Sequence, residues 1–300
     1  MVKPLVISVI LNTNRRDDTL ACLESIAAQS YPEHQVLVLD NASSDGSVEA
    51  IRERFSDVEI LQLQENRGYA GNNNLGIQVA LERGADWVFV LNEDTILDPD
   101  CIAALVGAGT QDSSIGIVGP LVYHYDEPTV IQSAGGVLDY MWEAHHIGQN
   151  EPDRQQYSIS RYVDWISGCA ILARREVIEQ LGMLDERFFY YWEETEWCLR
   201  TKRAGWKILH APQAKLWHKG VQRDYRPKPS VAYYNTRNKL LMMKKHRAPL
   251  IVWAMTIKRQ MQTALSYSIR PKWRDKREHR DALLRGARDF LWQRWGRGQP

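Results

Sequence analysis

The segment QVLVLDNASSDG, residues 35–46, decides the fold class. Its first half is a short apolar run that ends at Asp40, and its second half is polar and ends in glycine. A continuous apolar run of this length is typical of a strand that is buried on both faces of a parallel sheet. The segment therefore predicts a buried strand whose carboxyl end opens into a polar turn.

Similar runs surround this segment. They are LVISVIL (5–11), VEILQLQ (58–64) and WVFVLN (87–92), and helical patterns separate the four runs over residues 17–29, 45–55 and 70–84. The residues just past the runs are all polar: NTNRR (12–16), DNASSDG (40–46), ENRGYAG (65–71) and NEDT (92–95). This alternation predicts a doubly wound α/β unit whose ligand lies at the carboxyl ends of the strands.

The pattern changes after Asp98-Pro99. We expect strands over residues 115–123 and 165–173, two short strands over 206–220, and helices over 192–205 and 229–246. The remaining residues, 246–300, have the pattern of basic amphipathic helices.

Composition places the chain among ordinary globular proteins, with 44% hydrophobic and 25% charged residues. The four cysteines have no CxxC or metal-ligand spacing, which favours buried reduced thiols in a cytosolic protein. The first residues are typical of a strand and not of a signal peptide, and no apolar run approaches the roughly 20 residues that span a bilayer. The predicted location is cytoplasmic.

Charge is distributed unevenly along the chain. From Lys244 onward there are 15 basic and 4 acidic residues, a balance of +11, whereas the rest has 23 and 33, a balance of −10. A basic tail on an acidic body suggests contact with an anionic surface. We expect a membrane, with Trp253, Met255, Ile257 and Leu265 facing inward and basic side chains facing the lipid headgroups. A merely solvated helix is the alternative, and nucleic acid is not an expected partner because the chain has no recognition motif for it.

Two acidic strand ends suggest nucleotide chemistry. No GxGxxG or GxxxxGK[ST] motif is present, so a glycine-rich phosphate cradle is not expected. Asp40 could accept hydrogen bonds from a base or a ribose, or it could cap the next helix. Asn92, Glu93 and Asp94 offer hard oxygen ligands, which suit Mg²⁺ or Mn²⁺ bridging a diphosphate.

On these residues the chain resembles a family 2 glycosyltransferase of the GT-A fold, in its bacterial rhamnosyltransferase-like branch. The resemblance covers residues 5–245, through ISVILNTNRRDDTLACLESI, VLVLDNASSDGSVEAI, ENRGYAGNNNLGI, VFVLNEDTIL, the stretch from Val163 to Ile208, and YYNTRNKLL. It implies a Rossmann-like mixed sheet flanked by helices, in a domain of residues 1–245. Residues 1–100 would bind the nucleotide, residues 101–245 would hold the acceptor and the catalytic groups, and residues 246–300 would form a helical extension.

The same resemblance assigns roles to single residues. Donor contacts would come from the residues at the strand ends: Asn12, Asn14, Asp40, Arg67 and Asn92. Asp94 would be a metal ligand and His218 a second one, although a histidine at a strand end could equally pair with a carbonyl. In place of the family's usual motifs, this chain has glutamate at positions 93 and 194.

The stretch FFYYWEETEWCLR, residues 188–200, places acids among aromatic rings. By resemblance, Glu194 is the catalytic base that removes a proton from the acceptor hydroxyl, and Glu193 positions the acceptor. Aromatic surroundings would raise the pKa of such a base. Trp165, Trp192 and Glu196 would contact the acceptor, although Glu196 could instead pair with Arg200 one turn on.

The expected function is therefore metal-dependent, inverting transfer of a sugar from a nucleotide-sugar donor. L-rhamnose from dTDP-rhamnose is the candidate sugar, and a lipid-linked or polysaccharide glycan of the cell surface is the acceptor. The enzyme would lie on the cytoplasmic face of the cell membrane. Two alternatives remain: a nucleotidyltransferase, which should carry a glycine-rich turn after the first strand, or a non-catalytic sugar-binding protein of the same fold.

Overall fold

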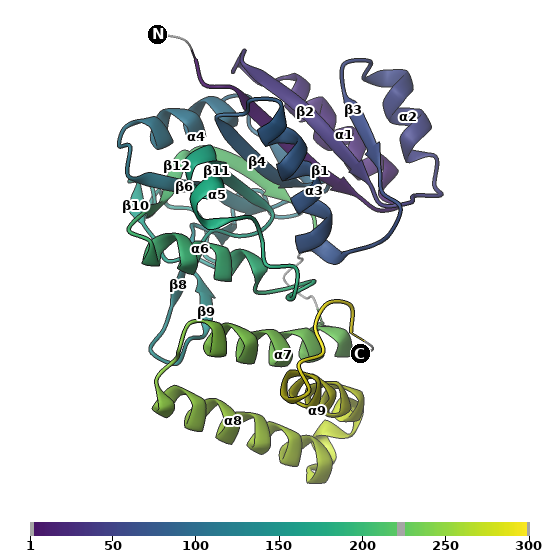
Figure 1. Cartoon of the computed structure of the whole chain (residues 1–300), viewed down its shortest axis with the longest axis vertical. Helices are drawn as coiled ribbons and strands as arrows, with labels where there is room; N and C mark the ends of the chain where they lie inside the picture. Colours follow the sequence, from purple (N-terminus) through teal and green to yellow (C-terminus); the bar gives the residue numbers. More distant parts are fainter. Residues whose placement is uncertain (1–2, 221–225, 299–300) are drawn as a thin grey trace.

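A computed structural model describes residues 3–220 and 226–298. Its centre is one mixed sheet in the order β10-β12-β6-β11-β4-β1-β2-β3, with β5 paired to β12 and β7 to β6 (Figure 1). The strands of this sheet are β1 (Val6–Asn12), β2 (His34–Asp40), β3 (Glu59–Gln62), β4 (Trp87–Asn92), β5 (Thr95–Leu97), β6 (Ile115–His124), β7 (Ile131–Ser133), β10 (Arg161–Tyr162), β11 (Ala170–Arg174) and β12 (Lys207–His218). A separate hairpin joins β8 (Gly136–Leu138) to β9 (Ala144–His146).

The first four long strands, β1 to β4, run parallel, as the apolar runs predict. β11 lies antiparallel between β4 and β6, which makes the sheet mixed. Residues 206–220 form the single strand β12 and not the two strands expected from the sequence. An irregularity between Ala211 and Lys215 bends β12 while its pairing with β6 continues on both sides of the bend, so the Pro and Gln there interrupt the pattern without ending the strand.

Helices cover both faces of the sheet (Figure 1). One apolar cluster joins a face to α1 (Arg16–Ala27), α2 (Ser47–Arg54) and α4 (Cys101–Thr110). A second cluster joins the other face to α3 (Gly68–Glu82), α5 (Arg175–Leu181) and α6 (Glu193–Arg203). The apolar faces of these helices pack on the two faces of the sheet. The carboxyl ends of the strands lie outside this packing and are therefore open to form a site.

The C-terminal part is helical, as predicted, and forms a layer beyond α6 (Figure 1). It comprises α7 (Pro229–Lys245), α8 (Leu250–Ile269), the short helix η1 (Pro271–Lys276) and α9 (Arg277–Leu291). α9 packs closely on α7, where a Cβ added to Gly286 would lie 2.5 Å from the Tyr233 carbonyl oxygen. None of the helices in the described residues is long and apolar enough to cross a membrane.

Candidate active site

A cleft of about 240 Å³ opens where the parallel strands end. Its walls come from the ends of β1, β2 and β4, the start of α3 and the loop before α6. The lining includes Thr13, Asn41, Tyr69, Asn92, Glu93, Phe189 and Tyr190. The structure therefore brings the predicted strand-end motifs and the aromatic stretch before α6 to the same cavity.

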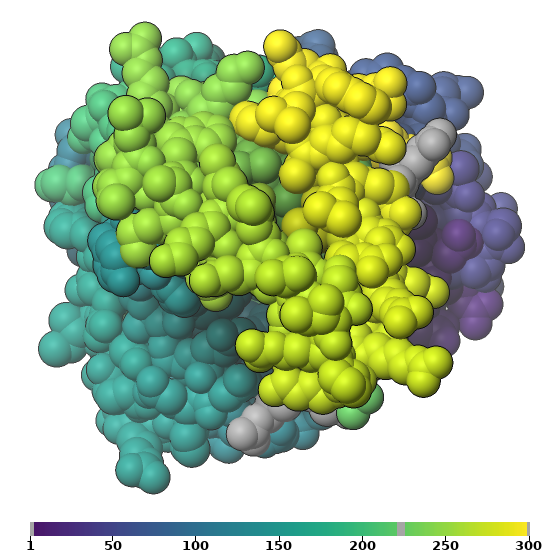
Figure 2. Space-filling view, turned by 90° about the horizontal axis from the view of Figure 1, so that it is seen from below, coloured from purple at the N-terminus to yellow at the C-terminus, as the bar shows by residue number. Residues whose placement is uncertain are grey.

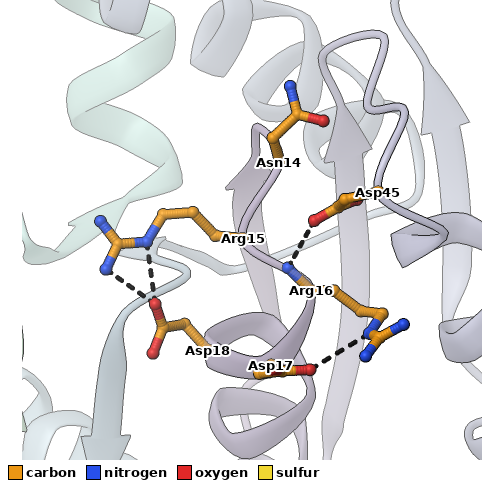
Figure 3. A pocket seen from close by; sticks show the side chains of 6 residues that line it. All are labelled: Asn14, Arg15, Arg16, Asp17, Asp18 and Asp45. Carbon is orange, nitrogen blue, oxygen red and sulfur yellow. Dashed lines mark hydrogen bonds and ion pairs between the residues drawn. The ribbon is translucent and has the colours of Figure 1, made fainter.

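A second hollow, of about 540 Å³, lies over the turn after β1 (Figure 3). It is lined by Asn14, Arg15, Arg16, Asp17, Asp18 and Asp45. Asp17 and Asp18 lie in the first turn of α1, after its N-cap Arg15. Asp18 accepts hydrogen bonds from Arg15 at 2.7 Å and from Lys219 at 3.0 Å. This hollow therefore has basic side chains held in place by acids.

Asn12 and Asp40 lie together at the strand ends, but both are fully buried. The Asn12 amide donates to Asp40 Oδ1 at 2.8 Å, and Asp40 Oδ2 accepts from the Ser43 backbone N–H at 3.1 Å. In this structure the pair holds the turn at 41–46 and does not reach the cleft.

Asn14 and Arg67 are exposed beside these turns. Asn14, at φ 51°, accepts from the Ser44 backbone N–H at 2.8 Å. The Arg67 guanidinium pairs with Glu65 at 2.7 Å at the start of α3. Both residues are near the site, whereas Asn92 lines the cleft directly.

Asp94 and His218 are separated by 124 residues yet lie side by side, because β12 pairs with β5. Asp94 Oδ1 is 3.1 Å from His218 Nε2. His218 Nδ1 lies 2.8 Å from Gln132 Oε1, so a ring that donates from Nδ1–H to Gln132 can present its Nε2 lone pair to a metal, whereas without a metal a proton on Nε2 can be donated to Asp94.

This pair fits a divalent cation. Two cis ligands at about 2.1 Å from an octahedral ion are about 3.0 Å apart, close to the observed separation. Within residues 3–220 and 226–298, no group of three or more His, Cys, Asp or Glu side chains could hold a metal by itself. Mg²⁺ and Mn²⁺ are commonly bound by one or two protein ligands together with phosphate oxygens and water, which matches this number. Gly220 keeps the space open, because a Cβ there would lie 2.5 Å from Asp94 Oδ2.

The electrostatics at this edge separate two neighbouring acids. Burial alone would raise the pKa of Asp94, but His218 and Arg15 together lower it. Arg15 Nη2 is 3.5 Å from Asp94 Oδ2. In contrast, burial and the nearby Asp94 charge raise the pKa of Glu93 to about 7. Asp94 is therefore the acid that stays ionised in the range where a cation would bind.

Glu193 and Glu194 begin α6, a few residues after Phe189 and Tyr190 of the cleft wall. Each has one buried carboxylate oxygen without a hydrogen-bond partner. Burial raises the pKa of both, and the Glu194 charge raises that of Glu193 further. A Cβ added to Gly168 would be 3.5 Å from both Tyr69 Oη and Glu194 Cγ, so Glu194 lies beside a tyrosine that lines the cleft. Two such unsatisfied acceptors suit a ligand that offers hydroxyl groups.

The predicted acceptor contacts Trp165 and Trp192 are mostly buried, at 4% and 9% exposed. Trp165 packs in the core beside the His146 ring, with a centroid distance of 4.7 Å. The Trp192 indole donates to Asn235 of α7 at 2.9 Å. Neither ring is among the residues that line the cleft, and Tyr69, Phe189 and Tyr190 take that place.

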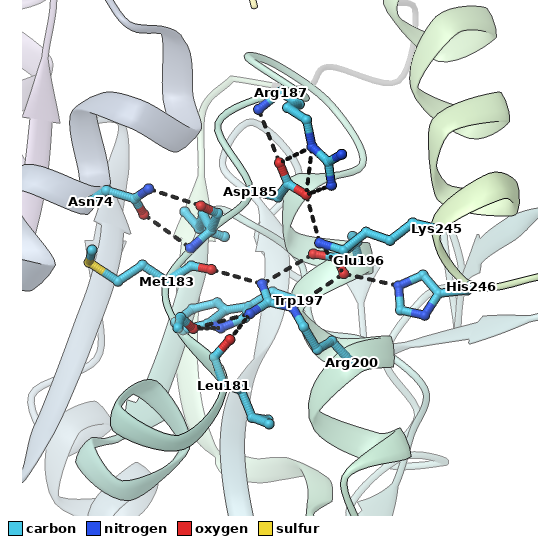
Figure 4. Close-up of polar contacts among 12 residues, drawn as sticks. Asn74, Leu181, Met183, Asp185, Arg187, Glu196, Trp197, Arg200, Lys245 and His246 are labelled. Carbon is cyan, nitrogen blue, oxygen red and sulfur yellow. Dashed lines mark hydrogen bonds and ion pairs between the residues drawn. The ribbon is translucent and has the colours of Figure 1, made fainter. Parts of the chain in front are cut away.

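Glu196 is fully buried and lies among Arg200, Lys245 and His246 (Figure 4). Its carboxylate pairs with Arg200 at 3.1 Å, Lys245 at 2.9 Å and His246 at 2.9 Å. The pairing with Arg200 that the spacing allows is therefore present, and Glu196 is not available to an acceptor. Lys245 also pairs with Asp185 at 2.6 Å, so the network joins α6, the end of α7 and the loop before α6.

Replacing Glu196 by Gln should cost about 3 kcal/mol of unfolding free energy at pH 7, because it leaves the partly buried Arg200 and Lys245 without this carboxylate. Burial would raise the pKa of Glu196, but His246, Arg200 and Lys245 lower it to about 2, from an ordinary 4.5. Its stabilisation is therefore complete above pH 4.5 and lost as the pH falls towards 2. Urea unfolding should show the difference between wild type and Glu196→Gln shrinking over that window. A difference independent of pH would contradict this.

The sequence reasoning missed three residues around the site. Arg15 and Tyr69 stand inside the quoted strand-end segments, and their charge and ring could have marked them. Gln132, which fixes the His218 ring, has no signal in the sequence, because only the pairing of β7 with β6 brings it there.

Comparison with known proteins agrees with this geometry. The family model for glycosyl transferase family 2 matches residues 8–182, more than half of the chain. The chain therefore belongs to glycosyltransferase family 2.

Individual relatives and solved structures point the same way. The chain is 28% identical over 287 residues to an N-acetylglucosaminyl-diphospho-decaprenol L-rhamnosyltransferase of Mycobacterium tuberculosis, with 88% of this chain and 92% of that protein covered. It is 25% identical to a dTDP-rhamnosyl transferase of Shigella flexneri, with 72% and 73% covered. Its fold is similar to that of a mannosyltransferase of Pyrobaculum calidifontis in complex with GDP-Man and Mn²⁺, at a TM-score of 0.61 and 17% identity, covering 98% of this chain and 89% of the other.

The GT-A fold and the glycosyltransferase class expected from the sequence are confirmed. The alternative functions, a nucleotidyltransferase or a non-catalytic sugar-binding protein, are not favoured.

Proposed function

We propose that this protein is a metal-dependent inverting glycosyltransferase of cell-surface glycan synthesis. One observation carries the proposal: Glu193 and Glu194, two carboxylates with unsatisfied oxygens, lie near Tyr69 of a cleft whose wall also includes Asn92 and Glu93, the residues that precede the metal-competent Asp94. A base on one side and a leaving-group site on the other are what a single displacement requires.

In this mechanism Glu194 accepts the proton of an acceptor hydroxyl while that oxygen forms a bond to the anomeric carbon. The bond from the anomeric carbon to the diphosphate oxygen breaks on the opposite side, which inverts the configuration. Glu193 orients the acceptor through a second hydrogen bond. Asp94 and His218 would hold Mg²⁺ or Mn²⁺, and the bound ion would stabilise negative charge on the leaving diphosphate. Arg15, 3.5 Å from Asp94, adds a fixed positive charge beside that position.

We propose L-rhamnose from dTDP-rhamnose as the donor sugar and a lipid-linked glycan as the acceptor, as the names of the two relatives suggest. Asn14, Arg67 and Asn92 would contact the donor from the strand ends. Asn12 and Asp40 would support this pocket by holding the turn at 41–46. They could contact the nucleobase of the donor only if that turn moves.

A thermal-shift screen of nucleotide sugars, with and without Mn²⁺, tests this proposal. A ligand present at 100 times its Kd adds about 2.7 kcal/mol to stability by mass action. We expect dTDP-rhamnose to raise the Tm only when Mn²⁺ is present. Stabilisation by nucleoside triphosphates but by none of the nucleotide sugars would favour a nucleotidyltransferase instead.

We also propose that the enzyme works on the cytoplasmic face of a membrane and touches it through α8. The sequence expectation for this helix needs correction, because only Trp253 of the four apolar residues named above packs inward, against Phe290. The outer face of α8 carries exposed apolar side chains from its first residue to its last, namely Leu250, Ile251, Ile257, Met261, Leu265 and Ile269, each between 47% and 86% exposed. α8 and α9 lie next to each other on one face of the molecule (Figure 2).

An apolar helix face with basic neighbours fits an anionic bilayer. Lys258 interrupts the stripe, and Arg259 and Arg270 flank it, all three exposed. The apolar side chains would enter the headgroup region while the basic ones pair with phosphates. Contact would then depend on insertion as well as on charge.

The double variant Ile257→Glu with Met261→Glu should reduce binding to phosphatidylcholine–phosphatidylserine vesicles by about tenfold or more, since burying one such side chain stabilises by about 1.5–3 kcal/mol. Co-sedimentation measures this. Ile159→Glu is the matched control, because Ile159 is 77% exposed outside this face. Raised salt should weaken wild-type binding only in part, as it screens charge but not insertion. Equal binding of all three proteins would rule out α8 as the contact.

A further inference from the structure

The loop that precedes the two catalytic carboxylates has an unusual backbone. Phe189, Tyr191 and Trp192 have φ angles of 63°, 67° and 76°. Side chains with a Cβ rarely adopt this left-handed region, and each such residue costs of the order of 1–3 kcal/mol. Conformations of this kind persist only where the surrounding structure holds them, so contacts to this loop from other elements are needed.

Asn238 of α7 supplies three of these contacts. Its Nδ2 lies 2.8 Å from the carbonyl oxygens of Phe188, Tyr190 and Tyr191, and its two N–H groups are shared among these three acceptors. The residue is fully buried, so these hydrogen bonds do not compete with water. One side chain thereby fixes the backbone at three positions within four residues.

Arg237, the residue before Asn238, supplies further hydrogen bonds to the same loop. Its guanidinium donates to the carbonyl oxygens of Arg187 at 3.2 Å and Phe188 at 2.9 Å, and it is also fully buried. The same group donates to the Gly296 carbonyl oxygen at 2.7 Å, and the Gly296 N–H donates to the Arg187 carbonyl oxygen at 3.2 Å. The C-terminal segment after α9 therefore closes a ring of hydrogen bonds with α7 and the loop.

The consequence for the site follows from chain connectivity. Trp192, the last left-handed residue, is the N-cap of α6, and Glu193 and Glu194 are the first two residues of that helix. The backbone angles at 189–192 therefore set where α6 begins and in which direction both carboxylates point. Phe189 and Tyr190 also line the cleft, so the same loop shapes its wall.

We propose that Arg237 and Asn238 are positioning residues, which hold the loop 187–192 so that Glu193 and Glu194 stay near Tyr69 of the cleft, with Gly296 completing the clamp. Neither residue touches the substrate in this account. The proposal rests on the proposed function to the extent that Glu194 is the base. Since a displacement of about 1 Å in a catalytic group can cost about 100-fold in rate, loss of the clamp should mainly affect turnover.

Asn238→Ala tests the clamp, with Lys239→Gln as the matched control. Lys239 is the next residue of α7 and is 6% exposed, but its partner at 2.5 Å is Glu143, in the loop of the β8–β9 hairpin. We expect Asn238→Ala to lower kcat by about 10- to 100-fold at saturating substrates, with the Kd for dTDP-rhamnose changed by about twofold or less. Lys239→Gln should keep kcat. Amide hydrogen exchange at 187–192 should be faster in Asn238→Ala only.

Wild-type kcat in a folded Asn238→Ala enzyme, or equally fast exchange at 187–192 in the control, would overturn the clamp. If Asn238→Ala does not fold, Asn238→Ser keeps one hydrogen-bond donor and should give an intermediate loss of kcat, and full kcat there would also overturn it. If the wild type transfers no sugar, the proposed function fails. The clamp is then judged by hydrogen exchange alone, with faster exchange specific to Asn238→Ala supporting it.

Discussion

Glu194→Gln is expected to lower kcat for sugar transfer by about 10²–10⁴-fold, the usual cost of losing a general base. Glutamine keeps the size and polarity of the side chain but cannot take the acceptor proton. The Kd of the donor should stay within about twofold, because in this mechanism Glu194, beside Tyr69 and Gly168, meets the acceptor and not the nucleotide. Stopped-flow transfer at saturating substrates, with calorimetry for the donor, separates the two quantities.

Glu193→Gln is the comparison for this variant. It removes the neighbouring carboxyl group, which also has one oxygen without a hydrogen-bond partner. Any general effect of losing a carboxyl group at the start of α6 should therefore appear in both variants. A positioning group should raise the acceptor KM more than it lowers kcat. If Glu193→Gln is the inactive variant and Glu194→Gln turns over normally, the roles of the two acids are reversed.

Asp94→Asn should weaken Mn²⁺-dependent donor binding by more than about 10- to 100-fold, the range found when even a residue behind a metal ligand is changed. The amide keeps one oxygen but cannot carry the negative charge of Asp94, whose pKa is lowered by His218 and Arg15. Because the defect is in metal affinity, excess Mn²⁺ should restore part of the donor binding. Calorimetric titration of dTDP-rhamnose at several Mn²⁺ concentrations measures this.

Asp40→Asn is the control for metal rescue. Asp40 is buried and bonded to Asn12 and to the Ser43 backbone N–H, so its loss should loosen the turn at 41–46 and weaken donor binding without involving the metal. Added Mn²⁺ should not help this variant. Rescue of both variants, or of neither, would contradict the assignment of Asp94 to the metal.

The sequence predicted well what depends on local pattern. Continuous apolar runs gave the parallel strands, and the polar residues after them gave the edge where the cleft lies. Asp94 could be predicted as a metal ligand because a strand end fixes its position to within a residue. His218 came from resemblance alone, since its meeting with Asp94 requires the antiparallel pairing of β12 with β5, a contact between distant segments.

Which side of an element is buried was harder to predict. Trp165 and Glu196 are of residue types that serve equally in a sugar site or in a core, and only packing decided for the core. α8 is amphipathic in both readings, but the contact with α9 turned Trp253 inward and left Ile257 and Leu265 outside. The carboxylate of Glu196 pairs with three basic residues, Arg200 of α6, Lys245 at the end of α7 and His246 just after it, of which the sequence spacing indicates only Arg200.

The central claim is inverting displacement with Glu194 as the base, and a single-turnover experiment tests it most directly. The enzyme, in excess over dTDP-rhamnose and in the presence of Mn²⁺, is mixed with a saturating glycan acceptor. The anomeric configuration of the product is then determined by NMR. We predict a product of inverted configuration from the wild type and a rate at least about 100-fold slower from Glu194→Gln. A product of retained configuration, or equal rates from the two proteins, would contradict the claim.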